Sequence, residues 1–227
     1  MEADRYMGYH QAPIFNWDSV AYDAASGYEF VPLLHSIQED HLLGWIEDVD
    51  RAIRAGTNHV MSFNEPDLCG SGGSCMTDIS RTVAAYQTYI HALSARYPEL
   101  QLGAPAVTNG PEFDRSLSWL SNFLRACGGC KVDFIAIHWY DSATNFAYFK
   151  KHVQDAHTVS GGRPVWITEF KPSGSEAQVI EFLRVALPWL DGQWYVEQYA
   201  MQWVARGELV DATGTALTAV GNAYNII

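Results

Sequence analysis

The chain has 227 residues, of which 48% are apolar and 18% charged, and its formal net charge is −12. This composition is typical of a folded globular protein, and no apolar run approaches the roughly 18 residues that a membrane-spanning helix needs. A strongly acidic chain repels polyanions, so we expect neither nucleic acid nor a membrane surface as a partner. A neutral substrate fits this charge better.

Short β-rich segments alternate with helical patterns from one end of the chain to the other. We expect strands at residues 5–10, 13–17, 28–35, 59–67, 100–107, 132–140, 163–170 and 194–204. Amphipathic helices are predicted at 39–56, 78–97 and 176–190, where apolar residues recur at helical spacing. The connections between the first three strands are too short for full helices, so the helices near the N-terminus should be trimmed.

Eight strands separated by helices predict an α/β fold in the form of one compact (β/α)8 barrel, also called a TIM barrel, over residues 1–227. No linker or internal repeat divides the chain. An open doubly wound sheet is the alternative, but it would usually carry a glycine-rich first turn, which this sequence lacks.

Four cysteines occur as two local pairs, Cys69 with Cys75 and Cys127 with Cys130. An even count at short spacings indicates two small disulfides and an oxidising compartment; free, redox-active or metal-binding thiols are the alternative. The second pair, "CGGC", follows a helical pattern instead of opening one, which is the wrong place for a redox thiol. An oxidising compartment favours a secreted or cell-wall-associated protein. The first ten residues lack an apolar signal-peptide core, so we expect that the leader is absent from this sequence.

Polar side chains cluster where the predicted strands end. Active sites of (β/α)8 barrels form at the carboxyl ends of the strands, and two carboxylates stand there: Glu65 on the fourth strand and Glu169 on the seventh. Such a pair can protonate a leaving oxygen and attack, or activate water, as the cleavage of a glycosidic bond requires. A lone glutamate at a strand end is also often a cap or a salt-bridge partner. Asp67 and Asp141 lie just past their strands, where turn or capping roles are expected.

Several motifs occur together in one order along the chain. They are "FNW", "FVPLL", "FNEPD", "APAV", "DFIAIHWY", "WITEF" and, near the C-terminus, "LVDATGTALTAVGNAYN". From about residue 7 to the C-terminus, the chain resembles glycoside hydrolase family 128, whose members are (β/α)8 β-1,3-glucanases. The motif "NEP" alone recurs across related families, whereas the ordered set is much more specific. The resemblance implies β-1,3-glucan or its oligosaccharides as the partner, and we expect the protein to act as a monomer.

The resemblance also implies a retaining double displacement. Glu65 matches the acid/base and Glu169 the nucleophile, while Asn64 matches the asparagine that hydrogen-bonds the sugar 2-hydroxyl. Tyr140 matches the tyrosine that holds the nucleophile, and His138 lies two residues earlier, on the same face of that strand. Whether glucan is cut internally or from an end depends on loops such as 69–75, 108–116 and 141–149.

The other substrate-binding candidates are aromatic or polar residues at strand ends. Trp17, Trp139 and Trp203 could offer flat faces to sugar rings, although each could instead pack in the core. Asn16 and His35 could hydrogen-bond sugar hydroxyls. The histidines form no HExxH motif and no tight cluster with aspartates, so we predict no metal and no other cofactor.

One position departs from the family pattern. Members usually carry an aromatic residue directly after the "YA" of the last strand, stacking under the sugar at the cleavage point, whereas Met201 follows it here. Trp203, two residues on and facing the same side, could take its place. The alternative reading is a protein that binds β-1,3-glucan oligosaccharides on a hydrolase scaffold, with weak or no turnover.

Overall fold

The computed structural model describes residues 13–22 and 28–225, and the predicted first strand at 5–10 lies outside these residues. The strands are β1 (Pro13–Ile14), β2 (Glu29–Phe30), β3 (His59–Val60), β4 (Cys69–Gly70), β5 (Gly73–Ser74), β6 (Gln101–Leu102), β7 (Ile135–Ser142), β8 (Val165–Ser173) and β9 (Val196–Met201). The helices are α1 (Glu39–Leu42), α2 (Trp45–Arg54), α3 (Ile79–Tyr86), the π-helical η1 (Gln87–His91), α4 (Leu93–Arg96), α5 (Ser116–Ala126), α6 (Phe146–Val159), α7 (Glu176–Asp191) and α8 (Ala219–Asn225). In the described part of the chain, no helix is long and apolar enough to cross a membrane.

Parallel pairing links the strands in chain order, apart from the antiparallel β4–β5 hairpin. β1 pairs with β2, β3 with β6, and β7 with β8, which in turn pairs with β9. Isolated parallel bridges continue this order: Leu33 with Met61 joins the segments that follow β2 and β3, and Val107 with Ile137 joins the segment after β6 to β7. The order β1-β2-β3-β6-β7-β8-β9 is the α/β arrangement that the sequence predicts.

The strands curve back so that side chains of distant strands meet. The ring of His59 on β3 lies 5.0 Å from that of Trp166 on β8, although β6 and β7 stand between these strands in the order. A small buried cluster fills this interior, formed by Val31, Leu33, Met61, Phe134 and Trp166. Among the described residues no pairing joins β9 to β1, so the closure of eight strands into a barrel stays a prediction.

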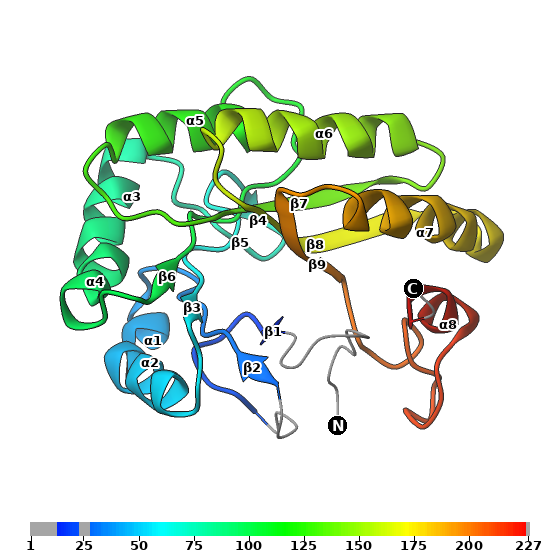
Figure 1. Cartoon of the computed structure of the whole chain (residues 1–227), viewed down its shortest axis with the longest axis horizontal. Helices are drawn as coiled ribbons and strands as arrows, with labels where there is room; N and C mark the ends of the chain where they lie inside the picture. The colour runs from blue at the N-terminus through cyan, green and yellow to red at the C-terminus, as the bar shows by residue number, and fades with distance from the viewer. Residues whose placement is uncertain (1–12, 23–27, 226–227) are drawn as a thin grey trace.

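Helices lie around the outside of the strands, from α1 and α2 through α3, α4 and α5 to α6 and α7 (Figure 1). Each amphipathic helix turns its apolar face to the sheet; α2, for example, buries Trp45, Val49 and Ala52 at helical spacing. α7 begins with a capping box, in which the Ser175 side chain accepts from the Gln178 backbone and the Gln178 side chain bonds back. These helices and the outward faces of the strands form the main core.

Three predicted helices are present with different boundaries. The helix predicted at 39–56 is divided into α1 and α2, because Gly44 takes a left-handed conformation (φ 78°) between them. The helix at 78–97 is α3, η1 and α4 in succession, and that at 176–190 is α7. The segment 141–149 was expected to be a loop, but α6 begins within it, at Phe146.

Both cysteine pairs are disulfides, as predicted: Cys69 with Cys75, and Cys127 with Cys130. The first closes the β4–β5 hairpin, an element that the sequence patterns did not reveal. Within this hairpin, the Ser74 N–H donates to the backbone carbonyl of Asn64 (2.9 Å). The disulfide therefore closes a small hairpin that lies beside Asn64, where the candidate site begins.

Candidate active site

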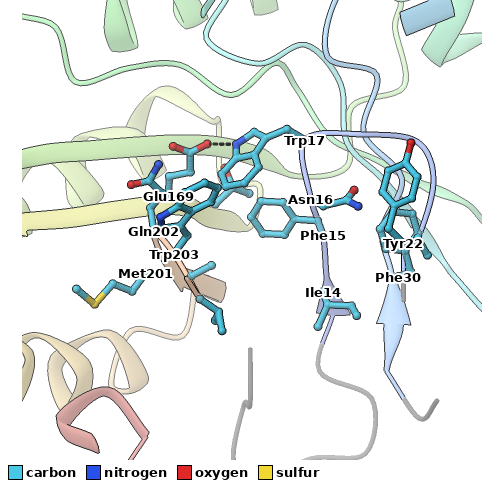
Figure 2. A pocket seen from close by; sticks show the side chains of 14 residues that line it. Ile14, Phe15, Asn16, Trp17, Tyr22, Phe30, Glu169, Met201, Gln202 and Trp203 are labelled. Carbon is cyan, nitrogen blue, oxygen red and sulfur yellow. Dashed lines mark hydrogen bonds between the residues drawn. The ribbon is translucent and has the colours of Figure 1, made fainter. Parts of the chain in front are cut away.

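A cleft of about 920 Å³ opens where the parallel strands end. Seven of the ten predicted catalytic or substrate-binding residues line it: Trp17, His35, Asn64, Glu65, Tyr140, Glu169 and Trp203. They meet because the carboxyl ends of neighbouring parallel strands lie at one edge of the sheet. A smaller pocket of about 170 Å³ adjoins the cleft and shares Trp17, Glu169 and Trp203 with it (Figure 2).

Glu65 is held by its backbone between two neighbouring segments. Its N–H donates to the carbonyl of Ala106 (2.8 Å), and the N–H of Asn64 donates to the carbonyl of His35 (3.0 Å). Glu65 has a φ of 40°, a conformation that costs free energy in a residue other than glycine and that clusters at functional sites. Pro66 follows and has no N–H, so it cannot donate a further hydrogen bond to the neighbouring segment.

Glu169 lies on β8, and donors hold both of its carboxylate oxygens. The indole N–H of Trp17 donates to Oε1 (2.5 Å), as Figure 2 shows, and the hydroxyl of Tyr140 donates to Oε2. Burial and the adjacent Glu169 carboxylate raise the pKa of Tyr140, so this hydroxyl keeps its proton and remains a donor. Two donors stabilise the ionised carboxylate and fix its orientation.

His138 connects the two glutamates. Its Nδ1 lies 2.8 Å from Glu65 Oε1 and 3.6 Å from Glu169 Oε2, and its Nε2 lies 3.0 Å from the Thr168 hydroxyl. Complete burial opposes the charged form of His138, but the carboxylates of Glu169 and Glu65 outweigh burial, and the pKa of His138 is raised. A protonated His138 donates to Glu65 and Thr168 and places a positive charge beside the two carboxyl groups.

The two carboxylates face each other at short range. One oxygen of Glu65, one oxygen of Glu169 and a ring nitrogen of His138 all lie within 4.8 Å of one another. In retaining glycosidases the carboxyl groups are about 5–5.5 Å apart, and in inverting ones about 6.5–9.5 Å. The spacing here agrees with the shorter class. The same three groups have the spacing of a metal site, so the expected absence of a metal stays a prediction.

Several known proteins are similar to this chain in sequence and in fold. The family model described as glycosyl hydrolase catalytic core matches residues 5–224. A curdlan-specific exo-β-1,3-glucanase of glycoside hydrolase family 128 from Blastomyces gilchristii, solved in complex with glucose, is 36% identical, and the match covers 95% of this chain and 89% of that one with a TM-score of 0.86. This chain belongs to glycoside hydrolase family 128.

Two further relatives differ in length and in similarity. An endo-β-1,3-glucanase of family 128 from Lentinula edodes is 25% identical, and the match covers 93% of this chain and 88% of that one with a TM-score of 0.77. Alkali-sensitive linkage protein 1 from Schizosaccharomyces pombe is 30% identical over an alignment of 230 residues, and the match covers 92% of this chain and 39% of that protein. The family 128 chain described here therefore spans about two fifths of the length of the S. pombe relative.

Two predicted substrate contacts of this family 128 chain are wrong. The Trp139 side chain is fully buried and packs on Phe149 (5.0 Å between ring centroids) and Phe182 (5.3 Å), because the alternation along β7 turns it toward the helices. His138 faces the glutamates but is buried and does not line the cleft. It contacts the carboxylates instead of a substrate.

Trp17 and Trp203 lie side by side next to Glu169 (Figure 2). Their ring centroids are 5.3 Å apart, with the planes inclined at 67°. Trp203 is 44% exposed, whereas Met201 is buried and its side chain points away from the two tryptophans. The aromatic side chain that lines the cleft just after β9 is therefore Trp203, and Met201 does not line it.

The polar candidates differ in which of their hydrogen-bonding groups are free. Asn64 donates its Nδ2 to the hairpin carbonyl of Gly72 (3.2 Å), and no described residue hydrogen-bonds to its Oδ1. The Nδ1 of His35 is likewise without a partner in the described segments; burial and the adjacent His41 lower the pKa of His35, so its ring is neutral at neutral pH. Asn16 lines the smaller pocket and donates to a carbonyl four residues on, so it serves the turn after β1.

Two functional contacts were missed in the sequence. Thr168, the residue before Glu169, hydrogen-bonds His138, and Trp17 donates to Glu169 across 152 residues of chain. The one signal that could have indicated a second role for Trp17 is that its indole N–H needs an acceptor when it is buried. Asp67 does not serve a turn of its own segment: its buried carboxylate accepts from the backbone N–H of Ser116, the first residue of the distant helix α5 (2.7 Å).

Proposed function

We propose that this protein is a retaining glycoside hydrolase that cleaves β-1,3-glucan, with Glu169 as nucleophile and Glu65 as acid/base. The observation that carries the proposal is the pairing of these two carboxylates within 4.8 Å at one cleft. This spacing suits direct attack by one carboxylate on the anomeric carbon, because an inverting pair needs more room for a water between carboxylate and sugar.

The reaction proceeds in two displacements at the anomeric carbon. Glu169 attacks this carbon and forms a glycosyl ester while Glu65, in its protonated form, gives its proton to the departing glycosidic oxygen. Glu65 then removes a proton from water, whose oxygen attacks the same carbon and releases Glu169 as a carboxylate. Each displacement inverts the configuration at the anomeric carbon. Two inversions give the product the same configuration as the substrate.

The neighbours of Glu169 support the role of nucleophile. The hydrogen bonds from Trp17 and Tyr140 favour its ionised form before attack and stabilise the carboxylate again when it leaves. On Glu65, His138 bonds Oε1 only, and no other described residue bonds its carboxylate, so its second oxygen is available to a substrate. The unpartnered Oδ1 of Asn64 can accept from the sugar 2-hydroxyl, a bond that strengthens in the transition state.

The choice of β-1,3-glucan rests on the relatives, which include exo- and endo-β-1,3-glucanases of family 128. The half-exposed ring of Trp203 supplies a flat apolar face beside Glu169 for the sugar at the cleavage point. We further propose a closed (β/α)8 barrel, a monomeric protein, and a secreted or cell-wall location, the last supported by the two disulfides.

Incubation with laminarin tests the proposal. Wild-type protein should release reducing sugar, Glu65→Ala and Glu169→Ala should release none, and Glu181→Ala, an exposed glutamate on α7 that is remote from the cleft, should match the wild type. Proton NMR of the first product should show the β-anomer. An α-anomer contradicts retention, and binding of laminarin without release supports the binding protein that the methionine after "YA" first suggested.

A further inference from the structure

The loop at residues 108–116, which leads from the segment after β6 to α5, forms one wall of the cleft. Thr108, Gly110, Pro111 and Arg115 of this loop line the cleft. A wall that extends the cleft beyond the reacting sugar is where a polysaccharide substrate would place its more distant rings.

Both ends of this loop are held by one buried carboxylate. Asp67, two residues after Glu65, accepts from the Thr108 hydroxyl (2.6 Å) and backbone N–H (3.2 Å), and from the Ser116 N–H (2.7 Å). The carboxylate is 2% exposed, so water does not compete for these bonds. The loop is therefore anchored at both ends to Asp67, two residues from Glu65.

The tip of this fixed loop presents an aromatic ring to solvent. The N–H of Arg115 donates to the carbonyl of Glu112 (3.1 Å), and the side chains of these two residues form an ion pair (3.2 Å), so residues 112–115 make a tight turn. Phe113 lies within this turn and is 89% exposed, the highest value among the large apolar side chains of the described residues. Pro111 and Arg115, on either side of it, line the cleft.

We propose that Phe113 is the stacking platform of an outer sugar subsite, which binds a glucose ring of a β-1,3-glucan chain beyond the cleft. The inference rests on the proposed function and adds to it a preference for longer chains. An exposed single phenylalanine needs no special role by itself. Three features together favour a binding role for Phe113: the exposure of its ring, its place between two cleft-lining residues, and the anchoring of its loop next to the acid/base.

Hydrolysis of laminarioligosaccharides of increasing length, from the triose to the heptaose, tests the subsite. Phe113→Ala should lower kcat/KM about threefold to tenfold on the longest substrates, the range expected for one aromatic contact, and leave the shortest cleaved substrate unchanged. Phe113→Trp should restore the activity on long substrates. Trp194→Ala is the matched control, because Trp194 is 81% exposed and precedes β9 at the end opposite the cleft; it should match the wild type at every length.

A loss of equal size at all lengths, or no loss at any length, overturns the subsite. Failure of the wild type to hydrolyse any of these substrates contradicts the proposed function, and titration with laminariheptaose then decides the subsite separately. Weaker binding by Phe113→Ala than by the wild type supports it. Equal affinities, or no binding by the wild type, overturn it.

Discussion

Replacing Trp17 by phenylalanine separates two roles that the structure gives to this residue. Its indole N–H donates to Glu169 Oε1 (2.5 Å), and its ring lies against that of Trp203. Phenylalanine keeps an aromatic face but has no donor. Hydrogen bonds to charged groups contribute about 1.5–3 kcal/mol, and each 1.4 kcal/mol corresponds to about tenfold in rate, so kcat/KM should fall about 10- to 150-fold.

The assay is kcat/KM on a laminarioligosaccharide, with thermal unfolding to show that the variant is folded. Trp203→Phe is the control, since Trp203 also lines the cleft and no hydrogen bond joins its indole N–H to Glu169 or Glu65. It should lose activity mainly through a higher KM. If Trp17→Phe keeps at least half of the wild-type kcat/KM, or if the two variants lose activity equally and through KM alone, the hydrogen bond from Trp17 does not support the nucleophile.

Three other outcomes follow from the site and its supports. The raised pKa of His138 contributes stability that is complete below its unfolded value of about 6.5 and is lost as pH rises through the folded value; urea unfolding should show this decline in the wild type and not in His138→Gln. Replacing Cys69 and Cys75 together by serine should lower the free energy of unfolding by about 2 kcal/mol, measured in urea; an unchanged midpoint contradicts this. Dialysis against EDTA should leave hydrolysis unchanged, and a loss that an added cation restores would show that a metal is required.

The sequence predicted the place of the two glutamates because that place depends on a simple rule. Glu65 and Glu169 each follow an apolar run, and parallel strands bring their carboxyl ends to one edge of the sheet. The α/β order of the strands followed from the same alternation of periods. These are local patterns, which the sequence shows without knowledge of the contacts between distant segments.

Other features depend on contacts that no local pattern reveals. Trp139 and Trp17 are both tryptophans at predicted strand ends, but the pleat of β7 turns Trp139 into the core. Trp17 instead follows a short strand and reaches Glu169. Gly44 divides a predicted helix because its left-handed conformation ends one helix and starts the next. The role of Asp67 was visible only as a capping tendency, and its hold on both ends of one cleft wall appears only in three dimensions.

The most direct test of the mechanism is covalent trapping with a 2-deoxy-2-fluoro-laminarioligosaccharide that carries an activated leaving group, followed by mass spectrometry of the digested protein. A glycosyl group attached to Glu169, and absent from Glu169→Ala, is the predicted result. A label on another residue contradicts the assignment of the nucleophile, and turnover of natural substrate without any covalent adduct contradicts the double displacement itself.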